Sequence, residues 1–529
     1  MTTPLLAVEG LTVGIAGRRL LDGVTLEAAR GSVLGVVGES GSGKSMTALA
    51  VMQLLPHGAT AGGRIALDGL DLAALVERAM CALRGRDVGM IFQEPMTALD
   101  PLRSIGDQVA ETVRIHGAAG RAEARAIAAA TLARVGLPEA RCPPTRDPHE
   151  LSGGQRQRVG IAMAIALRPK LLIADEPTTA LDVTTQAAVL ALLRRLVDED
   201  GMGLMLITHD LAVVAGLADR LAIMREGRVV EAGPTAATLH AMRHPYTRAL
   251  FAASAHRPAR VVRRGRAPLL EVEAMVRDYR VGRHLLRPPD VVRAVDGVSL
   301  VVHEGESVGL VGESGCGKST LGRAVLGLEA LQGGVVRIGG EGVRAGERMP
   351  RALRGRMQVV FQDPYGSFDP RHRVARLVAE PFHLVEGAPS GAARRAAVEK
   401  ALSDVGLALA AGELVDEAVG VGRRQRIAIA RALLIRPRLI VLDEAVSALD
   451  VRVRAQILDL LADLSDRTGM AYLFISHDLA VVRAITDRVL VMQAGRIVEE
   501  GPTAALFEAP RHPYTRELLA AAPVLEMAG

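Results

Sequence analysis

The sequence contains most of itself twice, and this duplication constrains the fold more than any other feature. GESGSGKS at residues 38–45 returns as GESGCGKS at residues 312–319. IADEPTTALD, ending at Asp182, returns as VLDEAVSALD, ending at Asp450. The copies are offset by 274 residues at the first motif and by 268 at the second. Repeats of this length are whole domains, because solenoid units repeat every 20–50 residues or so.

The two copies meet in a segment with a different composition. Residues 256–268 contain two Pro, one Gly and five Arg, and show neither helical nor strand periodicity. We therefore predict a first domain at residues 1–255, a short exposed linker at 256–268 and a second domain at 269–529. A solvated linker is favoured for these arginines, and contact with anionic lipid is the alternative.

Within each copy, apolar runs rich in β-branched residues alternate with helical stretches. SVLGVVG, LLIADEP and LMLITHD read as buried parallel strands. Residues 105–140, and the matching 375–410, read as helices without strands. The predicted class is α/β, with two domains that each have a mainly parallel sheet core and an inserted helical subdomain.

A Gly-rich loop between a strand and a helix is typical of a phosphate-binding loop. Its backbone N–H groups approach the phosphates, and the following helix points its N-terminus at them. Lys44 and Lys318 are expected to contact the β- and γ-phosphates, and Ser45 and Ser319 to ligate Mg²⁺. The other nucleotide contacts predicted here are Gly38, Gly43, Met46, Gly312, Gly317 and Thr320.

Paired carboxylates follow a second apolar strand in each copy. LLIAD and LIVLD place Asp175 and Asp443 at strand ends, where they are expected to lie beside the Mg²⁺. The next residues, Glu176 and Glu444, are candidate general bases that orient the attacking water. A solvated loop would not explain why both pairs follow buried strands at matched distances from a phosphate loop.

Two further motifs complete the candidate site. His209 and His477 each follow an apolar strand and precede Asp. A lone histidine there is more often structural, but its recurrence favours a contact with the γ-phosphate. HELSGGQRQR at residues 149–158 places a Ser and two Gly at a helix start, which makes an anion site. We expect this segment to bind a second face of the nucleotide, through Ser152, Gly153, Gly154 and Gln155.

These motifs resemble the ATP-binding cassette (ABC) family over nearly the whole chain, twice, and LSGGQ is highly specific for it. The resemblance implies two P-loop NTPase domains packed head to tail, with each ATP between the phosphate loop of one and the LSGGQ of the other. ATP and Mg²⁺ are the implied cofactors. It also implies that Gln93 and Gln362 link Mg²⁺ to the helical subdomain. Asp182 and Asp450 are implied to act across the dimer that the two cassettes form.

A finer resemblance concerns the peptide/nickel importer branch. GESGSGKS, the TALDP that follows Gln93, PHELSGGQRQR, and RHPYTR at residues 243–248 and 511–516 are similar to that branch. The chain resembles fused versions of its two ATPase subunits. This implies ATP hydrolysis coupled to import at the cytoplasmic face of the plasma membrane. The implied partners are two membrane permeases and an extracytoplasmic solute-binding protein. Family frequency favours peptide over nickel, glutathione or a sugar.

Many members of this branch carry a Cys-rich tail after HPYTR that suggests an iron–sulfur site. No such tail follows either motif here, so we expect no iron–sulfur cluster. The three cysteines, Cys81, Cys142 and Cys316, are widely scattered, which disfavours a zinc site or a disulfide framework. Cys316 occupies a variable position of the second phosphate loop, where a small filler is favoured over a redox switch.

The second copy departs from the first at the LSGGQ signature. Aligning GQRQRVGIA with GRRQRIAIA places Gly420 opposite Ser152 and Val421 opposite Gly153. A lost hydrogen bond to a charged group costs roughly 1.5–3 kcal/mol. By the resemblance, this altered signature serves the phosphate loop of the first copy.

An aromatic residue also differs between the copies. Tyr279 sits where the family places an adenine-stacking aromatic, and its counterpart is Ile15. We therefore predict a weak site at Lys44 and a strong one at Lys318. The alternative is that the signature changes are harmless, because backbone amides suffice.

Composition weighs against other classes of function. The 529 residues carry a net charge of +5 and include no Trp, 5 Tyr and 7 Phe, which disfavours a platform for single-stranded nucleic acid. The sequence shows no signal-peptide pattern and no run of about 18 apolar residues, so we expect a chain that is neither exported nor membrane-spanning by itself. A tandem-cassette ATPase acting on ribosomes is disfavoured, because it would show a long charged helical linker and the junction here is short. A tandem-cassette DNA-repair ATPase is disfavoured, because it would show zinc-ligand Cys pairs and this sequence has none.

Overall fold

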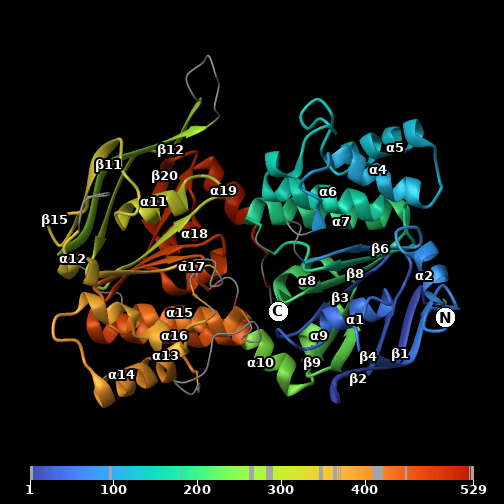
Figure 1. Cartoon of the computed structure of the whole chain (residues 1–529), viewed down its shortest axis with the longest axis horizontal. Coiled ribbons are helices and arrows are strands. Elements are labelled where there is room, and N and C mark those ends of the chain that lie inside the picture. The colour runs from blue at the N-terminus through green and yellow to red at the C-terminus, as the bar shows by residue number, and fades with distance from the viewer. Residues whose placement is uncertain are drawn as a thin grey trace. The chain divides into compact units, whose positions relative to one another are not determined.

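The computed structural model describes residues 4–93, 98–179, 181–260, 267–281, 290–344, 349–361, 366, 368–369, 371–407, 421–446, 449–523 and 525. The chain divides into two compact units (Figure 1). One comprises Met1–Leu181, Thr185–Ala255 and Pro523–Gly529, and the other comprises Asp182–Thr184 and His256–Ala522.

The first unit is built on a six-stranded, mostly parallel sheet. Three of its strands, β3 (Val33–Val37), β7 (Leu171–Asp175) and β8 (Gly203–Thr208), are buried at every residue. They are the apolar runs expected to form parallel strands, and the structure confirms both their parallel pairing and their burial. The strand order is β10-β9-β3-β8-β7-β6, in which only β10 is antiparallel. The remaining strands are β6 (Val88–Ile91), β9 (Arg220–Arg225) and β10 (Arg228–Pro234).

A second, antiparallel sheet in this unit was not predicted. Its order is β2-β1-β4-β5, with β1 (Leu6–Ile15), β2 (Arg18–Ala28), β4 (Ala59–Leu67) and β5 (Leu70–Asp71). A bulge near Gly10, which has a φ of 58°, shifts the pairing of β1 with β2 and β4. Such a bulge breaks the two-residue periodicity by which a strand is recognised.

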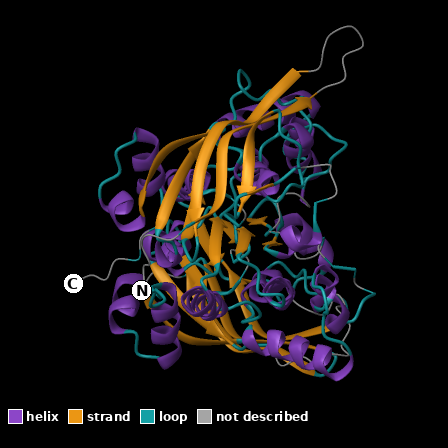
Figure 2. Ribbon diagram, turned by 90° about the vertical axis from the view of Figure 1, so that its left-hand side faces the viewer, coloured by secondary structure: helices purple, strands orange, loops and turns teal. Residues whose placement is uncertain are grey.

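The second unit repeats both sheets. Figure 2 shows the strands with helices on either side of them. The antiparallel sheet has the order β12-β11-β14-β15 and the parallel one the order β16-β17-β18-β13-β19-β20. The strands are β11 (Pro268–Val281), β12 (Asp290–His303), β13 (Ser307–Val311), β14 (Gly333–Ile338), β15 (Glu341–Gly342), β16 (Met357–Val360), β17 (Leu439–Asp443), β18 (Ala471–Ile475), β19 (Arg488–Gln493) and β20 (Arg496–Pro502).

Helices cover the parallel sheets. In the first unit they are α1 (Lys44–Val51), α2 (Glu77–Leu83), α4 (Ile105–Ile115), α5 (Arg121–Arg134), α6 (Gly153–Ile165), α7 (Val183–Asp200), α8 (Leu211–Leu217), α9 (Thr235–Ala241) and α10 (Pro245–Ser254). Helices α4 and α5 contact each other and α6, which confirms the inserted helical subdomain. None of the described helices has the length and apolarity needed to span a bilayer.

In the second unit the helices are α11 (Lys318–Val325), α12 (Arg351–Gly355), α13 (Val374–Val378), α14 (Gly391–Asp404), α15 (Val421–Leu433), α16 (Val451–Thr468), α17 (Leu479–Ile485), α18 (Thr503–Glu508) and α19 (Pro513–Ala520). Its inserted helices, α13 and α14, contact α15. Short 3₁₀ helices lie at Pro148–Glu150 and Glu380–Leu384.

The helix after each phosphate loop packs into a hydrophobic core of its unit. In the first unit this core includes Val8 of the antiparallel sheet, Val36 and Ile173 of the parallel sheet, and Ala48 and Val51 of α1. Helix α1 therefore joins both sheets, and the loop that precedes it is fixed at the edge of a rigid core.

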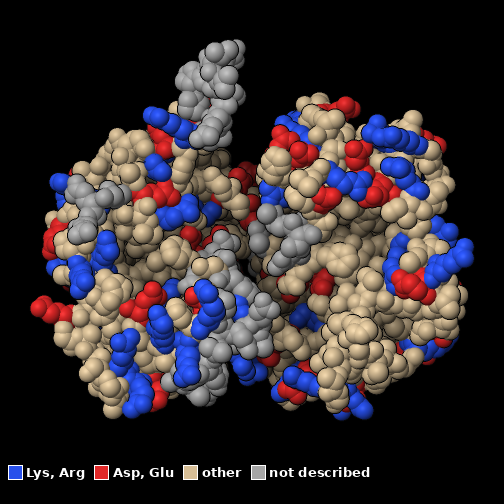
Figure 3. Space-filling model, in the orientation of Figure 1, with Lys and Arg blue, Asp and Glu red and all other residues tan. Residues whose placement is uncertain are grey.

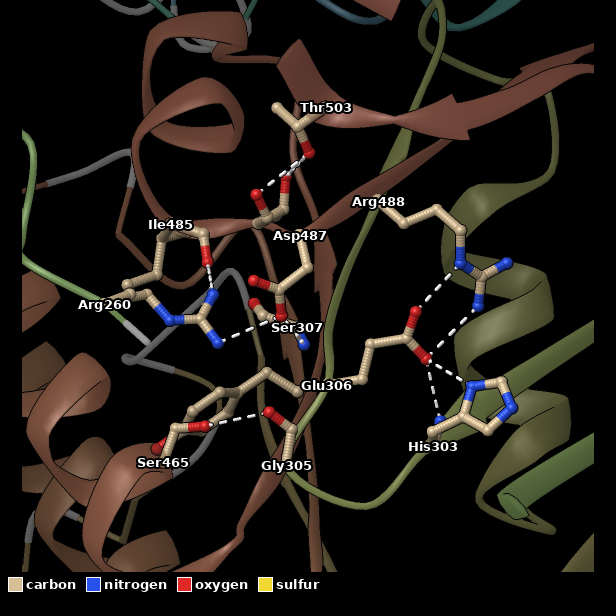
Figure 4. A network of polar contacts seen from close by, with 12 residues as sticks. Arg260, His303, Gly305, Glu306, Ser307, Ser465, Ile485, Asp487, Arg488 and Thr503 are labelled. Atoms are coloured by element: carbon tan, nitrogen blue, oxygen red, sulfur yellow. Dashed lines mark hydrogen bonds and ion pairs between the residues drawn. The ribbon is translucent and has the colours of Figure 1, made fainter. Parts of the chain in front are cut away.

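The segment between the repeats is not simply exposed. Arg260 is only 8% exposed and lies within the second unit, where it donates to Asp487 at 3.1 Å and to the carbonyl of Ile485 at the end of α17 (Figure 4). His256 Nε2 lies 2.7 Å from Asp459 of α16. The contacts of Arg260 differ from the solvated linker that we expected, because the charge pattern alone does not show where a buried carboxylate needs a partner. Arg257 is exposed as expected, and Arg263, Arg264 and Arg266 lie outside the described residues.

In the first unit, a different arginine pairs with the equivalent aspartate. Asp219, the repeat counterpart of Asp487, accepts a hydrogen bond from Arg194 of α7 at 3.1 Å. The position of Arg194 in the second copy is Ala462. Arg260 therefore supplies from the chain between the repeats the guanidinium that α7 supplies in the first unit.

Candidate nucleotide sites

The first phosphate loop lies between β3 and α1. At Gly43, with a φ of 100°, a Cβ atom would lie 2.4 Å from Leu21 Cδ2. A Cβ at Gly38 would lie 2.2 Å from the carbonyl oxygen of Met224. Only glycine fits these two places, and the loop therefore has a fixed shape. Lys44 is 6% exposed, and its Nζ donates to Gly38 O at 2.8 Å and to Glu39 O at 2.9 Å.

The second loop has the same construction between β13 and α11. Lys318 Nζ donates to Gly312 O and to Glu313 O, both at 2.7 Å. Gly317 has a φ of 108°, and a Cβ there would lie 2.1 Å from Ala294 O. The two loops thus hold their lysines through the same pair of backbone carbonyl contacts.

Two glycines of the second loop allow a matched test of this geometry. Gly317→Ala is expected to lower the free energy of unfolding by about 2–5 kcal/mol, from left-handed backbone strain plus overlap with a carbonyl. Gly315→Ala should cost about 1–2 kcal/mol, because Gly315 has a φ of 81° but nothing within 4 Å of a Cβ. Calorimetric unfolding measures both, and equal losses would contradict the close contact.

The predicted metal ligands come together beside each loop. Asp175 and Asp443 are the last residues of β7 and β17, and burial raises the pKa of both. Ser319 Oγ donates to Asp443 Oδ1 at 3.0 Å. In the first unit, the hydroxyl of Ser45 lowers the pKa of Asp175 against the effect of burial. Asp175 Oδ1 is buried and accepts no hydrogen bond from the described residues.

This donor set fits a hard cation. A hydroxyl and a carboxylate oxygen are ligands that Mg²⁺ prefers, and an unpartnered buried carboxylate oxygen favours a positive charge. Within the described ranges, no three Asp, Glu, His or Cys side chains gather into a metal cage. A Mg²⁺ ion here would therefore also need oxygens from phosphate.

Glu176 lies beside the histidine that was predicted with it. Its Oε1 lies 3.2 Å from His209 Nδ1, and its Oε2 accepts from Gln93 at 3.1 Å and from Thr179 at 2.9 Å. Burial raises the pKa of Glu176, but the hydrogen bonds from His209 and Thr179 outweigh it and lower the pKa to about 2. The carboxylate is therefore ionised and can accept a hydrogen bond from water. Thr179 was not predicted, because a Thr after Glu-Pro carries no distinctive signal.

The second unit repeats this pair. Glu444 Oε1 lies 3.3 Å from His477 Nδ1. Burial opposes the charge on both residues, yet their contact lowers the pKa of Glu444 and raises the pKa of His477. Gln362 lies outside the described residues.

Both glutamates have a left-handed backbone, with φ values of 48° at Glu176 and 53° at Glu444. This conformation is costly for a residue with a side chain, and such residues concentrate at functional sites. Their N–H groups donate to Ile207 O and Ile475 O of the neighbouring strands, which stabilises the conformation. The same strain at the same place in both copies supports a functional role for these glutamates.

The LSGGQ segment begins α6. Ser152 Oγ accepts from Gln155 N at 3.3 Å, and Gln155 Oε1 accepts from Ser152 N at 3.0 Å, which makes a capping box. A Cβ at Gly154 would lie 2.3 Å from Thr185 Cγ2, whereas Gly153 is not crowded in this way. No described hydrogen bond joins this segment to the phosphate loop of its own unit.

The second signature is described only in part. Helix α15 begins at Val421, the counterpart of the first residue of α6, whereas Gly420 lies outside the described residues. Of the aspartates predicted to act across the dimer, Asp450 caps α16 by accepting from Val453 N at 3.0 Å. Asp182 is buried and accepts from Thr184 Oγ1 at 2.7 Å.

Tyr279 is held near the second phosphate loop. Its hydroxyl donates to Glu329 and lies 3.5 Å from Thr320 Oγ1, two residues after the loop lysine. The guanidinium of Arg277 covers one ring face, 4.4 Å from the centroid, and also donates to Glu329 at 2.8 Å. The opposite ring face is the one that a base could stack on.

The first unit has apolar residues at these places. Gly10 and Ala274 both have a left-handed backbone, and we align the two copies on them. Ile15 and Tyr279 then each lie five positions later and are counterparts. The counterpart of Glu329 is Leu55, which packs against the apolar core. The two candidate sites therefore differ in the residues around the base, although their phosphate loops match.

Cys316 is buried in the second loop, with Sγ 3.8 Å from Lys318 Nζ. Burial raises the pKa of this thiol and so disfavours the reactive thiolate.

Comparison with known families agrees with this geometry. The ABC transporter family model matches residues 21–179 and 295–447. The chain belongs to the ABC transporter family. A second model, "Oligopeptide/dipeptide transporter, C-terminal region", matches residues 230–273 and 498–528 of this ABC protein. The duplication, the fold and the family resemblance inferred from the sequence are thereby confirmed.

Curated relatives resemble this ABC protein over nearly its whole length. It is 46% identical to the peptidoglycan transport ATP-binding protein YejF of Agrobacterium fabrum, with 98% of this chain and 97% of the relative covered. It is 45% identical to the glutathione import ATP-binding protein GsiA of Escherichia coli K12, with 99% and 90% covered. A solved dimeric ATP-binding cassette, MJ0796 bound to ADP and phosphate, is 29% identical, with a TM-score of 0.39 over 44% of this chain and 98% of that one.

The chain is therefore an ATP-binding subunit of an ABC transporter, with two fused cassettes that bind and hydrolyse ATP.

Proposed function

We propose that this ABC ATPase powers the uptake of peptides or small peptide-like solutes. The proposal rests on one observation, which is that each unit combines a loop lysine and a glutamate–histidine pair with a match to an oligopeptide-transporter C-terminal region. The names of the relatives, for peptidoglycan transport and glutathione import, support this solute class. Nickel or another small solute is the alternative. The proposed domains are residues 1–255 and 269–529, joined by 256–268.

In the proposed mechanism, Lys44 and Lys318 contact the β- and γ-phosphates from the positions in which their carbonyl acceptors hold them. A Mg²⁺ ion bound at the Ser–Asp pair would neutralise charge on the phosphate oxygens. Glu176 and Glu444 orient water for attack on the γ-phosphate, and their ionised carboxylates accept hydrogen bonds from it. His209 and His477 fix these carboxylates by the contacts described above.

The remaining site residues complete the sites by the family resemblance. Each signature serves the phosphate loop of the other cassette, and Asp182 and Asp450 act between the cassettes. The first signature supplies Ser152, whereas the second has Gly420 in its place. Tyr279 stacks on the adenine, and Ile15 offers no such ring. We therefore propose that the site of Lys318 is strong and the site of Lys44 weak.

The proposed partners are two membrane permeases and a solute-binding protein outside the cell, which place the chain at the cytoplasmic face of the plasma membrane. The helical subdomains around α4 and α13 are the proposed docking surface. Figure 3 shows acidic and basic side chains interspersed on the visible face, without one sign covering it. This face therefore offers no extended basic surface for anionic lipid or ribosomal RNA.

Co-expression tests this assignment. With its permeases present, the chain is expected to move to the membrane fraction and to support ATP-dependent uptake of a labelled dipeptide. Without them it should stay in the soluble fraction, and it should not sediment with ribosomes. Equal membrane binding with and without permeases would contradict the proposal, as would co-sedimentation with ribosomes.

A further inference from the structure

The RHPYTR motif occurs twice, and the proposed ATP chemistry gives it no role. Its tyrosines, Tyr246 and Tyr514, lie at the second positions of α10 and α19 and are 3% and 4% exposed. Each is more than 200 residues along the chain from the phosphate loop of its own unit. A buried tyrosine hydroxyl needs a polar partner, so the partner of each one indicates what it does.

Both hydroxyls contact the phosphate loop. Glu39 N donates to Tyr246 Oη at 3.1 Å, and Glu313 N donates to Tyr514 Oη at 2.9 Å. The carbonyl of the same peptide bond, on Gly38, accepts from the Nζ of the loop lysine at 2.8 Å. One peptide group is therefore held from both sides, by the tyrosine at its N–H and by the lysine at its oxygen.

The second unit shows the same peptide group and the same two partners. Gly312 O accepts from Lys318 Nζ at 2.7 Å, while the N–H of the following residue is bound by Tyr514. A peptide group is planar, so fixing its N–H fixes the direction of its carbonyl. The tyrosine thus determines where the acceptor of the lysine points.

The rest of the motif holds the tyrosine in place. His244 Nδ1 accepts from Tyr246 N at 3.1 Å. Glu231 of β10 accepts from the backbone of Arg243 and His244 and from Thr247 Oγ1. The second copy repeats the backbone contacts, with Glu499 at 2.8 and 3.0 Å from the equivalent nitrogens, but Thr515 Oγ1 has no hydrogen-bond partner among the described residues. The His and Tyr of the motif therefore have connected structural roles in both copies, and the Thr has one in the first.

We propose that Tyr246 and Tyr514 are positioning residues that fix the first peptide group of each phosphate loop and thereby orient the lysine that binds phosphate. This rests on the proposed function in one respect, namely that Lys44 and Lys318 bind the phosphates of ATP. The RHPYTR regions then serve as braces for the ATP sites.

The test uses the double variant Tyr246→Phe/Tyr514→Phe of the full chain, which removes only the two hydroxyls. The control is Tyr472→Phe, because the hydroxyl of Tyr472 is fully buried and donates to Leu461 O at 3.1 Å, in a strand that does not lead into the loop. The probes are ATP, inorganic tripolyphosphate, which has no base, and adenosine, which has no phosphate. Dissociation constants are measured by competition, and hydrogen exchange reports the amides of Glu39 and Glu313.

The double variant is expected to bind ATP and tripolyphosphate about 2- to 10-fold more weakly than the wild type, as expected for one lost hydrogen bond per loop. Adenosine affinity should be unchanged, and the two loop amides should exchange faster. The control should change none of these. Unchanged tripolyphosphate affinity would overturn the positioning role, and so would an equal loss for adenosine. If tripolyphosphate did not compete with ATP in the wild type, the phosphate-site assignment itself would fail.

Discussion

Replacing Lys318 with alanine is expected to lower the ATP turnover of the assembled transporter by about 100-fold or more, the usual scale for losing a donor to reacting oxygens. Lys44→Ala is expected to leave a measurable fraction of turnover. The two loops hold their lysines with the same contacts, so unequal effects cannot come from the loops. They would come from the second signature, where Gly420 replaces Ser152, and from the base-binding residues near Tyr279.

Both variants lose the same pair of lysine–carbonyl hydrogen bonds, so any general effect on loop stability cancels in the comparison. Steady-state ATPase assays on the complex with its permeases measure the result. Equal losses would remove the case for unequal sites, and they would indicate that the changes at Gly420 and Val421 are harmless.

Arg260→Ala is expected to destabilise the second unit by about 3–5 kcal/mol, because it leaves the carboxylate of Asp487 buried without its ion pair. Arg260 is 8% exposed and Asp487 14%. The variant also removes the donor to Ile485 O at the C-terminus of α17. Thermal unfolding of the full chain measures the loss, which should be confined to one of two transitions.

The loss should depend on pH. Burial raises the pKa of Asp487 in spite of Arg260, and Glu306 nearby raises it further. A carboxyl whose pKa is higher in the folded state favours folding at low pH, and this contribution is lost as the pH rises through the folded pKa. Removing Arg260 raises that pKa more. The difference in stability between wild type and variant should therefore be largest at neutral and alkaline pH and should shrink on acidification.

Arg194→Ala in the first unit is the matched control. Its partner Asp219 is 48% exposed and Arg194 is 34% exposed, so solvent screens their interaction and the loss should stay below about 1 kcal/mol. Arg260→Ala/Asp487→Asn should recover part of the stability, since no buried charge remains. Equal destabilisation by the two arginine variants would contradict the role given to burial.

The sequence predicted the parallel sheets, and indicated candidate site residues at the ends of their strands, because both signals are local. Val33–Val37 and Leu171–Asp175 are continuous apolar runs, and the loop glycines have a motif of their own. The antiparallel sheets were missed because bulges at Gly10 and Ala274 interrupt their alternation. The left-handed backbone of Glu176 was also beyond reach, since it depends on pairing with Ile207 of another strand.

Contacts between distant segments were the other gap. Nothing in RHPYTR itself shows that Tyr246 reaches Glu39, because the contact exists only once the sheet brings the two segments together. The exact repeat of the motif was the one available signal, and it indicated importance without indicating a role. The support of Tyr279 by Glu329 was missed for the same reason.

The position of Arg260 bears on how such a fused gene could be divided again. The sequence repeat resumes at residue 269, so a fission there would give a second half with every ATP-site motif of that copy. That half would nevertheless lack Arg260, the only described cation within ion-pair distance of Asp487. A fission just before His256 would keep it. The segment that keeps the Arg260–Asp487 ion pair is therefore longer than the repeat. It includes the few residues that precede the repeat in the sequence.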